Sequence, residues 1–134
     1  MAYYIIHDNP IRIGQWSELL GDRMAGSYDH PAKFYLAVST NPEKFKGATF
    51  IFDRYWPGKK DLIKTNLFQN IKLLIKKIEG LIVISSMNHQ DFDKISGVDL
   101  VLLGKARTHE EMTKALIKAE NSQVNIIGTA RKNI

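Results

Sequence analysis

Short apolar runs alternate with stretches of helical periodicity along most of the chain, and this alternation limits the folds that are open to it. Five runs have the length and apolarity of buried strands: residues 3–6, 34–38, 48–52, 81–84 and 98–103. Helical spacing of apolar residues occurs between or after them: residues 15–25, 61–79 and 108 to about 120. The segments 41–47 and 87–96 leave room for short helices only. Strands that alternate with helices predict an α/β fold, with a parallel sheet covered by helices on both faces.

The helix predicted at 61–79 has the clearest pattern. Its apolar positions recur at spacings of three and four: Ile63, Leu67, Ile71, Leu74, Ile75 and Ile78. Gly80 is a typical helix end. Near the C-terminus, Thr108 and Glu111 form a capping box that marks the start of the last helix. The length of 134 residues fits one domain. We expect this domain at 1–121, followed at 122–134 by an extra strand near 124–127 or a linker.

The composition excludes several classes of protein. The chain has no Cys, which excludes a disulfide scaffold and a thiolate metal site. No apolar stretch approaches the ~20 residues of a membrane span, and the N-terminus lacks the features of a signal peptide. We therefore expect a soluble, cytoplasmic protein without a membrane partner.

The positive charge is concentrated in one segment. Residues 54–77 contain seven Lys or Arg and one acid, Asp61, so this segment carries +6 while the remainder of the chain carries −1. A solvated helix face explains such a segment, and that is the simpler interpretation. The alternative is a surface for an acidic protein or for nucleic acid.

Polar side chains that could bind a ligand or take part in catalysis follow the predicted strands. They are His7 and Asp8, then Asp53, then Ser85, then Lys105. In doubly wound sheets ligands bind beyond the carboxyl ends of the strands. Because these residues share that edge, we expect them to lie near one another.

These residue types are suited to phosphoryl acceptance. Paired carboxylates, here Asp8 and Asp53, suit Mg2+, which prefers oxygen ligands. A carboxylate such as Asp53 can attack a phosphoryl group and form an aspartyl phosphate. Lys105 could supply the cation that this reaction needs, and the Ser85 hydroxyl could hydrogen-bond the new phosphoryl oxygens.

Four segments resemble those of response-regulator receiver domains of two-component signalling. They are Ile-Ile-His-Asp-Asn-Pro at 5–10, Phe-Ile-Phe-Asp-Arg-Tyr-Trp-Pro-Gly at 50–58, Leu-Ile-Val-Ile-Ser-Ser at 81–86, and the run from Gly97 to Lys105. Their order and spacing also resemble the family, over residues 3 to 120. The resemblance implies a flavodoxin-like fold with a five-stranded sheet in the order 2-1-3-4-5.

The resemblance also implies roles for individual residues and partners. Asp53 would be the phosphorylated residue, with Ser85 as the hydroxyl switch and Lys105 as the cation on the phosphoryl group. Asp8, Asp53 and the backbone carbonyl of Tyr55 would ligate Mg2+. The domain would act in a phosphorelay as a regulatory module rather than an enzyme. Its partner would be a histidine kinase, a phosphotransfer protein or a fused output domain.

Several positions depart from the family pattern. His7 stands where the family has an acid, which should weaken Mg2+ binding because imidazole is a poor partner for that ion. Ala106 replaces the usual Pro, and the fifth strand is aliphatic around Leu102. A pseudo-receiver, which binds a protein without phosphate chemistry, is therefore the alternative. Less favoured alternatives are a small nucleotide-binding or nucleic-acid-binding α/β protein, and the sequence lacks both the P-loop and the dinucleotide fingerprint.

Overall fold

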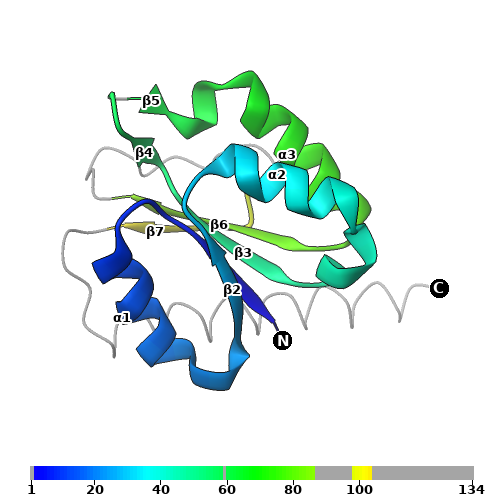
Figure 1. Cartoon of the computed structure of the whole chain (residues 1–134). Helices are drawn as coiled ribbons and strands as arrows, with labels where there is room; N and C mark the ends of the chain where they lie inside the picture. Colours follow the sequence, from blue (N-terminus) through cyan, green and yellow to red (C-terminus); the bar gives the residue numbers. More distant parts are fainter. Residues whose placement is uncertain (1, 59, 87–97, 104–134) are drawn as a thin grey trace.

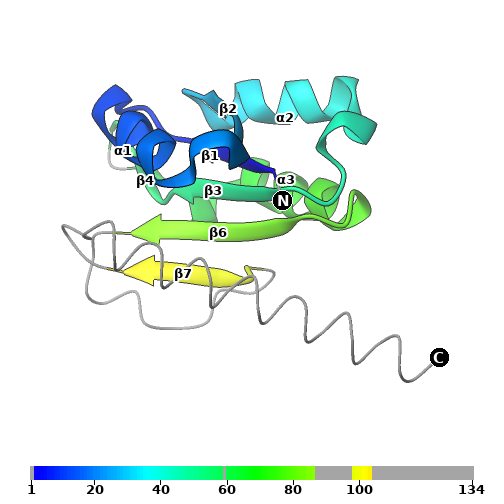
Figure 2. The same cartoon turned by 90° about the horizontal axis from the view of Figure 1, so that it is seen from below.

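The computed structural model describes residues 2–58, 60–86 and 98–103. Five strands form one parallel sheet in the order β2-β1-β3-β6-β7. Their bounds are Tyr3–Ile6 for β1, Met24–Tyr28 for β2, Thr49–Asp53 for β3, Leu81–Ser86 for β6 and Leu100–Leu103 for β7. Figure 2 shows β6 and β7 side by side and running in the same direction. The predicted α/β fold and the strand order 2-1-3-4-5 are confirmed, with strands counted along the chain within this sheet.

Helices cover both faces of the sheet. Helix α1 (Pro10–Leu20) lies on one face, and α2 (Pro31–Thr40) and α3 (Asn66–Lys77) lie together on the other (Figure 1). Three short 3-10 segments extend or precede these elements: η1 (Gly21–Arg23), η2 (Pro42–Phe45) and η3 (Leu62–Lys64). Within the described ranges, no helix has the length and apolarity needed to cross a membrane.

Each face of the sheet packs into its own hydrophobic core, because successive strand residues point to opposite faces. The core under α1 contains Tyr3, Ile5, Trp16, Leu20, Ile51 and Val83. The core under α2 and α3 is larger and rich in aromatic rings. Its aromatic members include Tyr4, Phe34, Phe45, Phe50, Phe52, Trp56 and Phe68.

The second strand lies outside the segment predicted for it. Residues 34–38, predicted as a strand, belong to α2, and the strand is β2 at Met24–Tyr28. Pro31 occupies the first helical turn, and the His30 ring accepts a hydrogen bond from the Ala32 N–H at 3.0 Å. Phe34 and Val38, four residues apart, are buried while Leu36 between them is 68% exposed, which is a helical pattern. Strand β2 was missed because an edge strand built from Met, Ala, Gly, Ser and Tyr has no apolar run.

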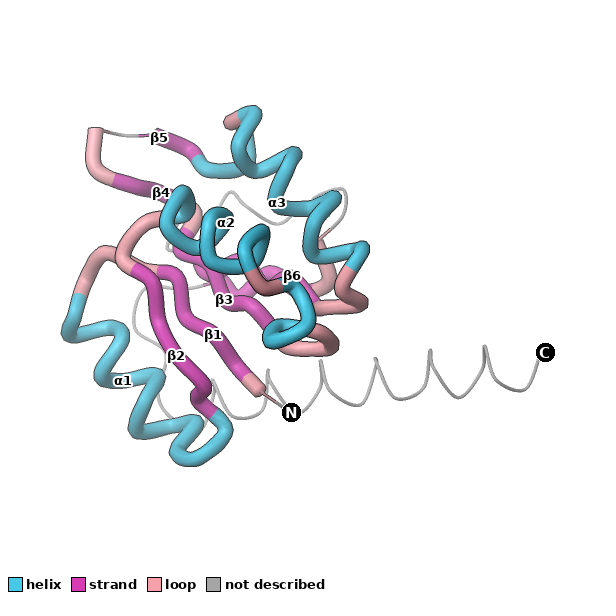
Figure 3. The backbone as a smooth tube through the Cα atoms, turned by 45° about the vertical axis from the view of Figure 1, so that its right-hand side comes forward, coloured by secondary structure: helices cyan, strands magenta, loops and turns pink. Residues whose placement is uncertain are grey.

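Two predicted helices have different bounds in the structure. The helix predicted at 15–25 is α1, which begins at Pro10 because the Asn9 side chain caps it, accepting from the Ile11 N–H at 2.9 Å. The helix predicted at 61–79 begins only at Asn66, with Thr65 as its cap. Before it, the chain forms a small antiparallel hairpin of β4 (Tyr55–Trp56) and β5 (Lys60–Asp61). Figure 3 shows this hairpin apart from the main sheet, near the start of α3.

Only some of the remaining predicted helices and strands fall within the residues that the structure describes. The short helix expected at 41–47 is η2, and the strand expected at 98–103 begins at Leu100. The segment 87–96, the helix from 108 to about 120, the segment 124–127 and the boundary at 121 lie outside the described residues.

Candidate functional site

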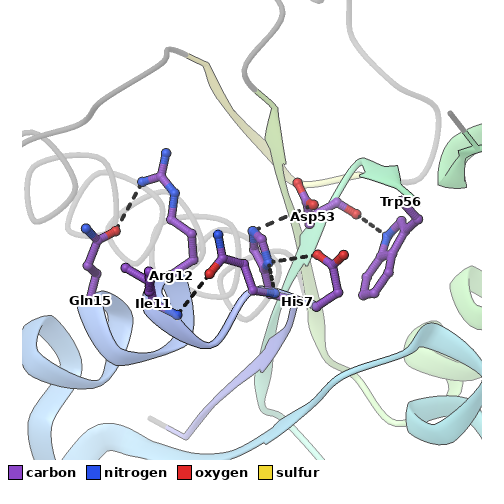
Figure 4. A network of polar contacts seen from close by, with 8 residues as sticks. His7, Ile11, Arg12, Gln15, Asp53 and Trp56 are labelled. Atoms are coloured by element: carbon purple, nitrogen blue, oxygen red, sulfur yellow. Dashed lines mark hydrogen bonds and ion pairs between the residues drawn. The ribbon is translucent and has the colours of Figure 1, made fainter. Parts of the chain in front are cut away.

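His7, Asp8 and Asp53 converge at the carboxyl edge of the sheet. Strands β1 and β3 pair directly, with Ile6 opposite Phe52, so the residues that follow are neighbours. The ligand-type atoms of the three side chains all lie within 4.8 Å of one another. Figure 4 shows the His7 ring beside the Asp53 carboxylate, and the Asp8 carboxylate also lies against this ring. The structure thus brings together Asp8 and Asp53, the two carboxylates that the sequence placed at strand ends.

The His7 ring is fixed by contacts on both of its nitrogens. The backbone N–H of Asn9 donates to Nδ1 at 3.0 Å, and Asp8 Oδ1 lies 3.3 Å from the same nitrogen. On the other side, Nε2 lies 3.6 Å from Asp53 Oδ2. The side chain is only 13% exposed, and this burial lowers the pKa of His7, an effect that the Asp8 carboxylate opposes. The ring is therefore held in place and disfavours its charged form.

Asp53 ends β3 in a half-buried position. Burial, followed by the negative charge of Asp8, raises the pKa of Asp53 to about 6. A hydrogen bond from the Arg54 backbone N–H and the charge of Arg12 act in the opposite direction. The indole N–H of Trp56 donates to the backbone carbonyl of Asp53 at 2.7 Å. Asp53 is thus anchored through its backbone while its carboxylate faces His7 (Figure 4).

Ser85 lies beside Asp53 in the neighbouring strand. Asp53 and Ser85 are register partners in the β3–β6 ladder, and partners in a parallel ladder present their side chains to the same face. The Arg54 N–H donates to the Ser85 carbonyl at 3.0 Å, which joins the two strand ends. The Ser85 side chain is half-buried. The hydroxyl therefore belongs to the same strand-end face as the Asp53 carboxylate.

Of the two remaining predicted site residues, the structure describes Tyr55 but not Lys105. Tyr55 follows Asp53 by two residues and opens β4, with its ring 37% exposed and 5.1 Å from the Arg54 guanidinium. Lys105 lies outside the described residues, as does Ala106.

An ion pair behind the site was not foreseen from the sequence. Arg54 donates to both carboxylate oxygens of Asp61, at 3.1 and 3.0 Å, and both side chains are nearly buried. This pair closes the β4–β5 hairpin, whose tip contains Pro57 and Gly58, the latter at a φ of 83°. A Pro-Gly pair between residues of opposite charge was the available signal for this hairpin. The Arg54 guanidinium is therefore paired with Asp61.

The donor set has two chemical characters. The Asp8 and Asp53 carboxylates suit a hard divalent cation, whereas an imidazole suits softer metals. The cluster is consistent with a metal-binding acidic site, in which the two carboxylates, rather than His7, fit Mg2+.

No protein-family model and no curated protein matches the chain. Solved structures do match. The isolated REC domain of RcsB from Salmonella enterica serovar Typhimurium, solved with phosphomimetic BeF3-, is 21% identical, with a TM-score of 0.61 over 90% of this chain and 88% of that one. SdrG from Sphingomonas melonis Fr1 is 18% identical, with a TM-score of 0.61 over 89% of this chain and 95% of SdrG.

A CheY-like receiver domain protein from Methanospirillum hungatei JF-1 is 15% identical, with a TM-score of 0.60 over 91% of this chain and 96% of that one. A further match is RcsB from Salmonella enterica serovar Typhimurium bound to promoter rprA, and this chain covers 66% of the length of that RcsB chain. The TM-scores of about 0.6 over most of the chain indicate a shared fold. The protein therefore has the fold of response-regulator receiver domains.

Proposed function

We propose that the protein is a signalling domain in which Asp53 accepts a phosphoryl group. The convergence of Asp53 with Asp8 and His7 at the carboxyl edge of the sheet supports this proposal above all. A carboxylate at this edge can act as the nucleophile toward phosphorus. Ser85, its register partner, would hydrogen-bond the phosphoryl oxygens, and Lys105 would contribute positive charge.

The proposed phosphoryl acceptance would use a bound divalent cation. Asp8, Asp53 and the backbone carbonyl of Tyr55 would hold Mg2+, which when bound supplies positive charge to the transferred oxygens. His7 would weaken this binding, because it replaces an oxygen ligand by an imidazole.

Phosphorylation would act by shifting a two-state equilibrium that changes one protein-binding face. The phosphoryl group would come from a histidine kinase or a phosphotransfer protein in the cytoplasm. A fused output domain or a separate protein would read the change. Among the matching structures, RcsB from Salmonella was solved bound to promoter rprA, and another match is a DNA-binding response regulator of the LuxR family from Staphylococcus aureus.

Intact-mass measurement tests the proposal directly. Incubation with phosphoramidate and Mg2+ should add the mass of one phosphoryl group, and Asp53→Ala should abolish the adduct. Asp22→Ala, which removes an exposed carboxylate from η1, should leave it unchanged. An adduct that persists in Asp53→Ala would show that Asp53 is not the acceptor.

His7 favours a second candidate function. A histidine beside Asp53, in place of a carboxylate, suits a pseudo-receiver that binds a protein partner without phosphate chemistry. This candidate predicts no measurable Mg2+ affinity by calorimetry and no phosphoryl adduct. It also predicts that Asp53→Asn binds its partner as tightly as the original protein does.

A further inference from the structure

The outer face of α3 and of the segment before it carries lysines and amides but no exposed acid. Between Lys60 and Lys77 the single acid is Asp61, and its carboxylate is held by Arg54 in a nearly buried ion pair. Glu79 is the next acid along the chain, after the helix has ended. The exposed residues of the segment, which we call the lysine face, are Lys60, Lys64, Asn66, Gln69, Asn70, Leu73, Lys76 and Lys77.

The lysines of this face have no acidic counterpart. Within residues 2–58, 60–86 and 98–103, none of the four forms an ion pair, whereas Lys33 on the neighbouring α2 pairs with Asp29 at 2.8 Å. Solvated helix faces usually mix both signs of charge. The helix dipole favours Lys76 and Lys77 in the last turn of α3, but not Lys60 and Lys64, which precede the helix. The uncompensated charge of the lysine face therefore suits an anionic partner.

The side chains of the lysine face distinguish among anionic partners. Protein interfaces are depleted in lysine and a membrane surface requires an apolar helix face, but Leu73 is the one large apolar side chain of the lysine face. Single-stranded nucleic acid is held largely by stacking on aromatic rings, and the lysine face contains none. Contacts with the phosphates of a double helix need only cations and polar donors. The composition of the face therefore favours a nucleic-acid duplex.

The lysines form two groups that are separated by the length of α3. Lys60 and Lys64 lie before the helix, and Lys76 and Lys77 lie in its last turn. Figure 1 shows α3 leading away from β5, and its 12 residues extend about 18 Å. The major groove of DNA is about 12 Å wide, so the two groups can reach phosphates on opposite sides of it. The amides of the face lie between the two groups: Asn66, Gln69 and Asn70.

We propose that the lysine face binds the phosphate backbone of double-helical nucleic acid across a groove. Lys60 and Lys64 contact one strand, and Lys76 and Lys77 contact the other. Because phosphate contacts carry no sequence information, this binding is not specific for sequence. It is independent of phosphoryl chemistry at Asp53, so Asp53→Ala should bind as the original protein does.

Fluorescence anisotropy of a short labelled DNA duplex of mixed sequence, titrated with the full chain, tests the proposal. Each phosphate contact contributes about −0.9 to the slope of log affinity against log salt, so four contacts predict a loss of affinity of about 100-fold between about 50 and 200 mM KCl. Absent binding at the lower salt concentration, or binding that salt leaves unchanged, would overturn the proposal. Tighter binding of a single strand of the same length would overturn the assignment to a duplex.

Single substitutions of exposed lysines locate the surface. Lys64→Gln and Lys76→Gln should each reduce the salt slope by about 1, whereas Lys33→Gln, the matched control on α2, should leave it unchanged. Leu73→Ala should keep the original affinity, because phosphate contacts use no apolar anchor. Thermal denaturation checks that each variant is folded. Equal losses in Lys33→Gln and Lys76→Gln would show that only overall charge matters, and the proposal would then fail.

Two other anions test the class of partner. Phosphatidylserine vesicles stand for an anionic membrane and polyglutamate for an acidic protein, and both should bind the full chain more weakly than the duplex does at the same salt concentration. Binding of either one as tightly as the duplex, or a loss of affinity in Leu73→Ala as large as in Lys76→Gln, would contradict the proposed partner.

Discussion

Trp56 donates its indole N–H to the backbone carbonyl of Asp53 at 2.7 Å, across only three residues of chain. This contact turns the chain sharply after β3 and directs it into the β4–β5 hairpin. The Trp56 ring itself is buried in the aromatic core under α2 and α3. The backbone of Asp53 is therefore fixed from the face of the sheet opposite to α1.

Trp56→Phe should loosen this anchor while keeping an aromatic ring. Loss of the hydrogen bond leaves a carbonyl without its donor, and we expect the free energy of unfolding to fall by about 1 kcal/mol. Phosphoryl acceptance should also slow, because the carboxylate is less well positioned. Urea denaturation and the rate of adduct formation check the two effects.

Trp16→Phe is the matched control, since Trp16 is buried under α1 in the other core. It should lower stability without changing the rate of adduct formation per folded molecule. Equal rates in the two Trp variants would show that the indole bond does not position Asp53.

Asp53→Asn should stabilise the protein at neutral pH. The pKa of Asp53 is raised from 3.8 to about 6 by burial, so between these values the folded protein binds a proton that the unfolded chain has released. The free energy of unfolding therefore decreases as pH rises through this window. The loss is complete above it and amounts to at most about 3 kcal/mol.

Urea denaturation at a series of pH values should show this decrease in the original protein and not in Asp53→Asn. His7 contributes the opposite slope, because its pKa is lowered and stability is lost as pH falls below the ordinary value of 6.5. A decrease that survives in Asp53→Asn would have to come from another group. Asp22→Asn, at an exposed carboxylate, should keep the original profile.

Asp61→Asn should weaken the hairpin. The change keeps an oxygen that can cap η3 through the Ile63 N–H, but leaves the nearly buried Arg54 guanidinium without its charged partner. We expect a loss of about 2 kcal/mol in the free energy of unfolding.

The exposed pair of Asp29 and Lys33 provides the comparison. Its atoms are as close, at 2.8 Å, but the side chains are 62% and 68% exposed, so Asp29→Asn should change stability far less. Similar losses in the two variants, measured by urea denaturation, would contradict the role given to the Arg54 pair.

Gly80→Ala should destabilise the turn from α3 into β6. A Cβ at this position would lie 2.7 Å from Phe50 Cε2 and 2.9 Å from the Ala48 backbone oxygen. That oxygen also accepts the Leu81 N–H, so it cannot move away without cost. We expect a loss of about 2 kcal/mol.

Gly14→Ala is the control within α1, because a Cβ there has no neighbour within 4 Å. It should raise the free energy of unfolding by about 0.5–1 kcal/mol through helix propensity. Thermal or urea denaturation of the two variants should therefore show shifts of opposite sign.

The fold could be predicted where apolar runs are continuous. Strands β1, β3 and β6 each contain a continuous run of buried apolar residues, so their pattern is unambiguous. Strand β2 lies at the edge and is built partly from Ala25, Gly26 and Ser27. Its position depends on pairing with β1, which a local sequence pattern does not reveal. The strand was predicted instead at residues 34–38, because this part of α2 is rich in apolar residues.

The site could be predicted as far as topology determines it. Adjacent parallel strands end at the same edge, so Asp8 and Asp53 had to be close. The direction of the His7 ring depends on a hydrogen bond from the Asn9 backbone. The pairing of Arg54 with Asp61 depends on the hairpin between them. Neither interaction follows from residue type or spacing alone.

Strand β3 contributes to both hydrophobic cores. Ile51 packs under α1, whereas Phe50 and Phe52 pack among the aromatic rings under α2 and α3. The same strand ends in Asp53. Added bulk or charge at that carboxylate would therefore act on a strand that is packed on both of its faces. A chemical event at one side chain would thus be felt simultaneously by two separately packed layers, and the aromatic layer would report it in near-ultraviolet circular dichroism.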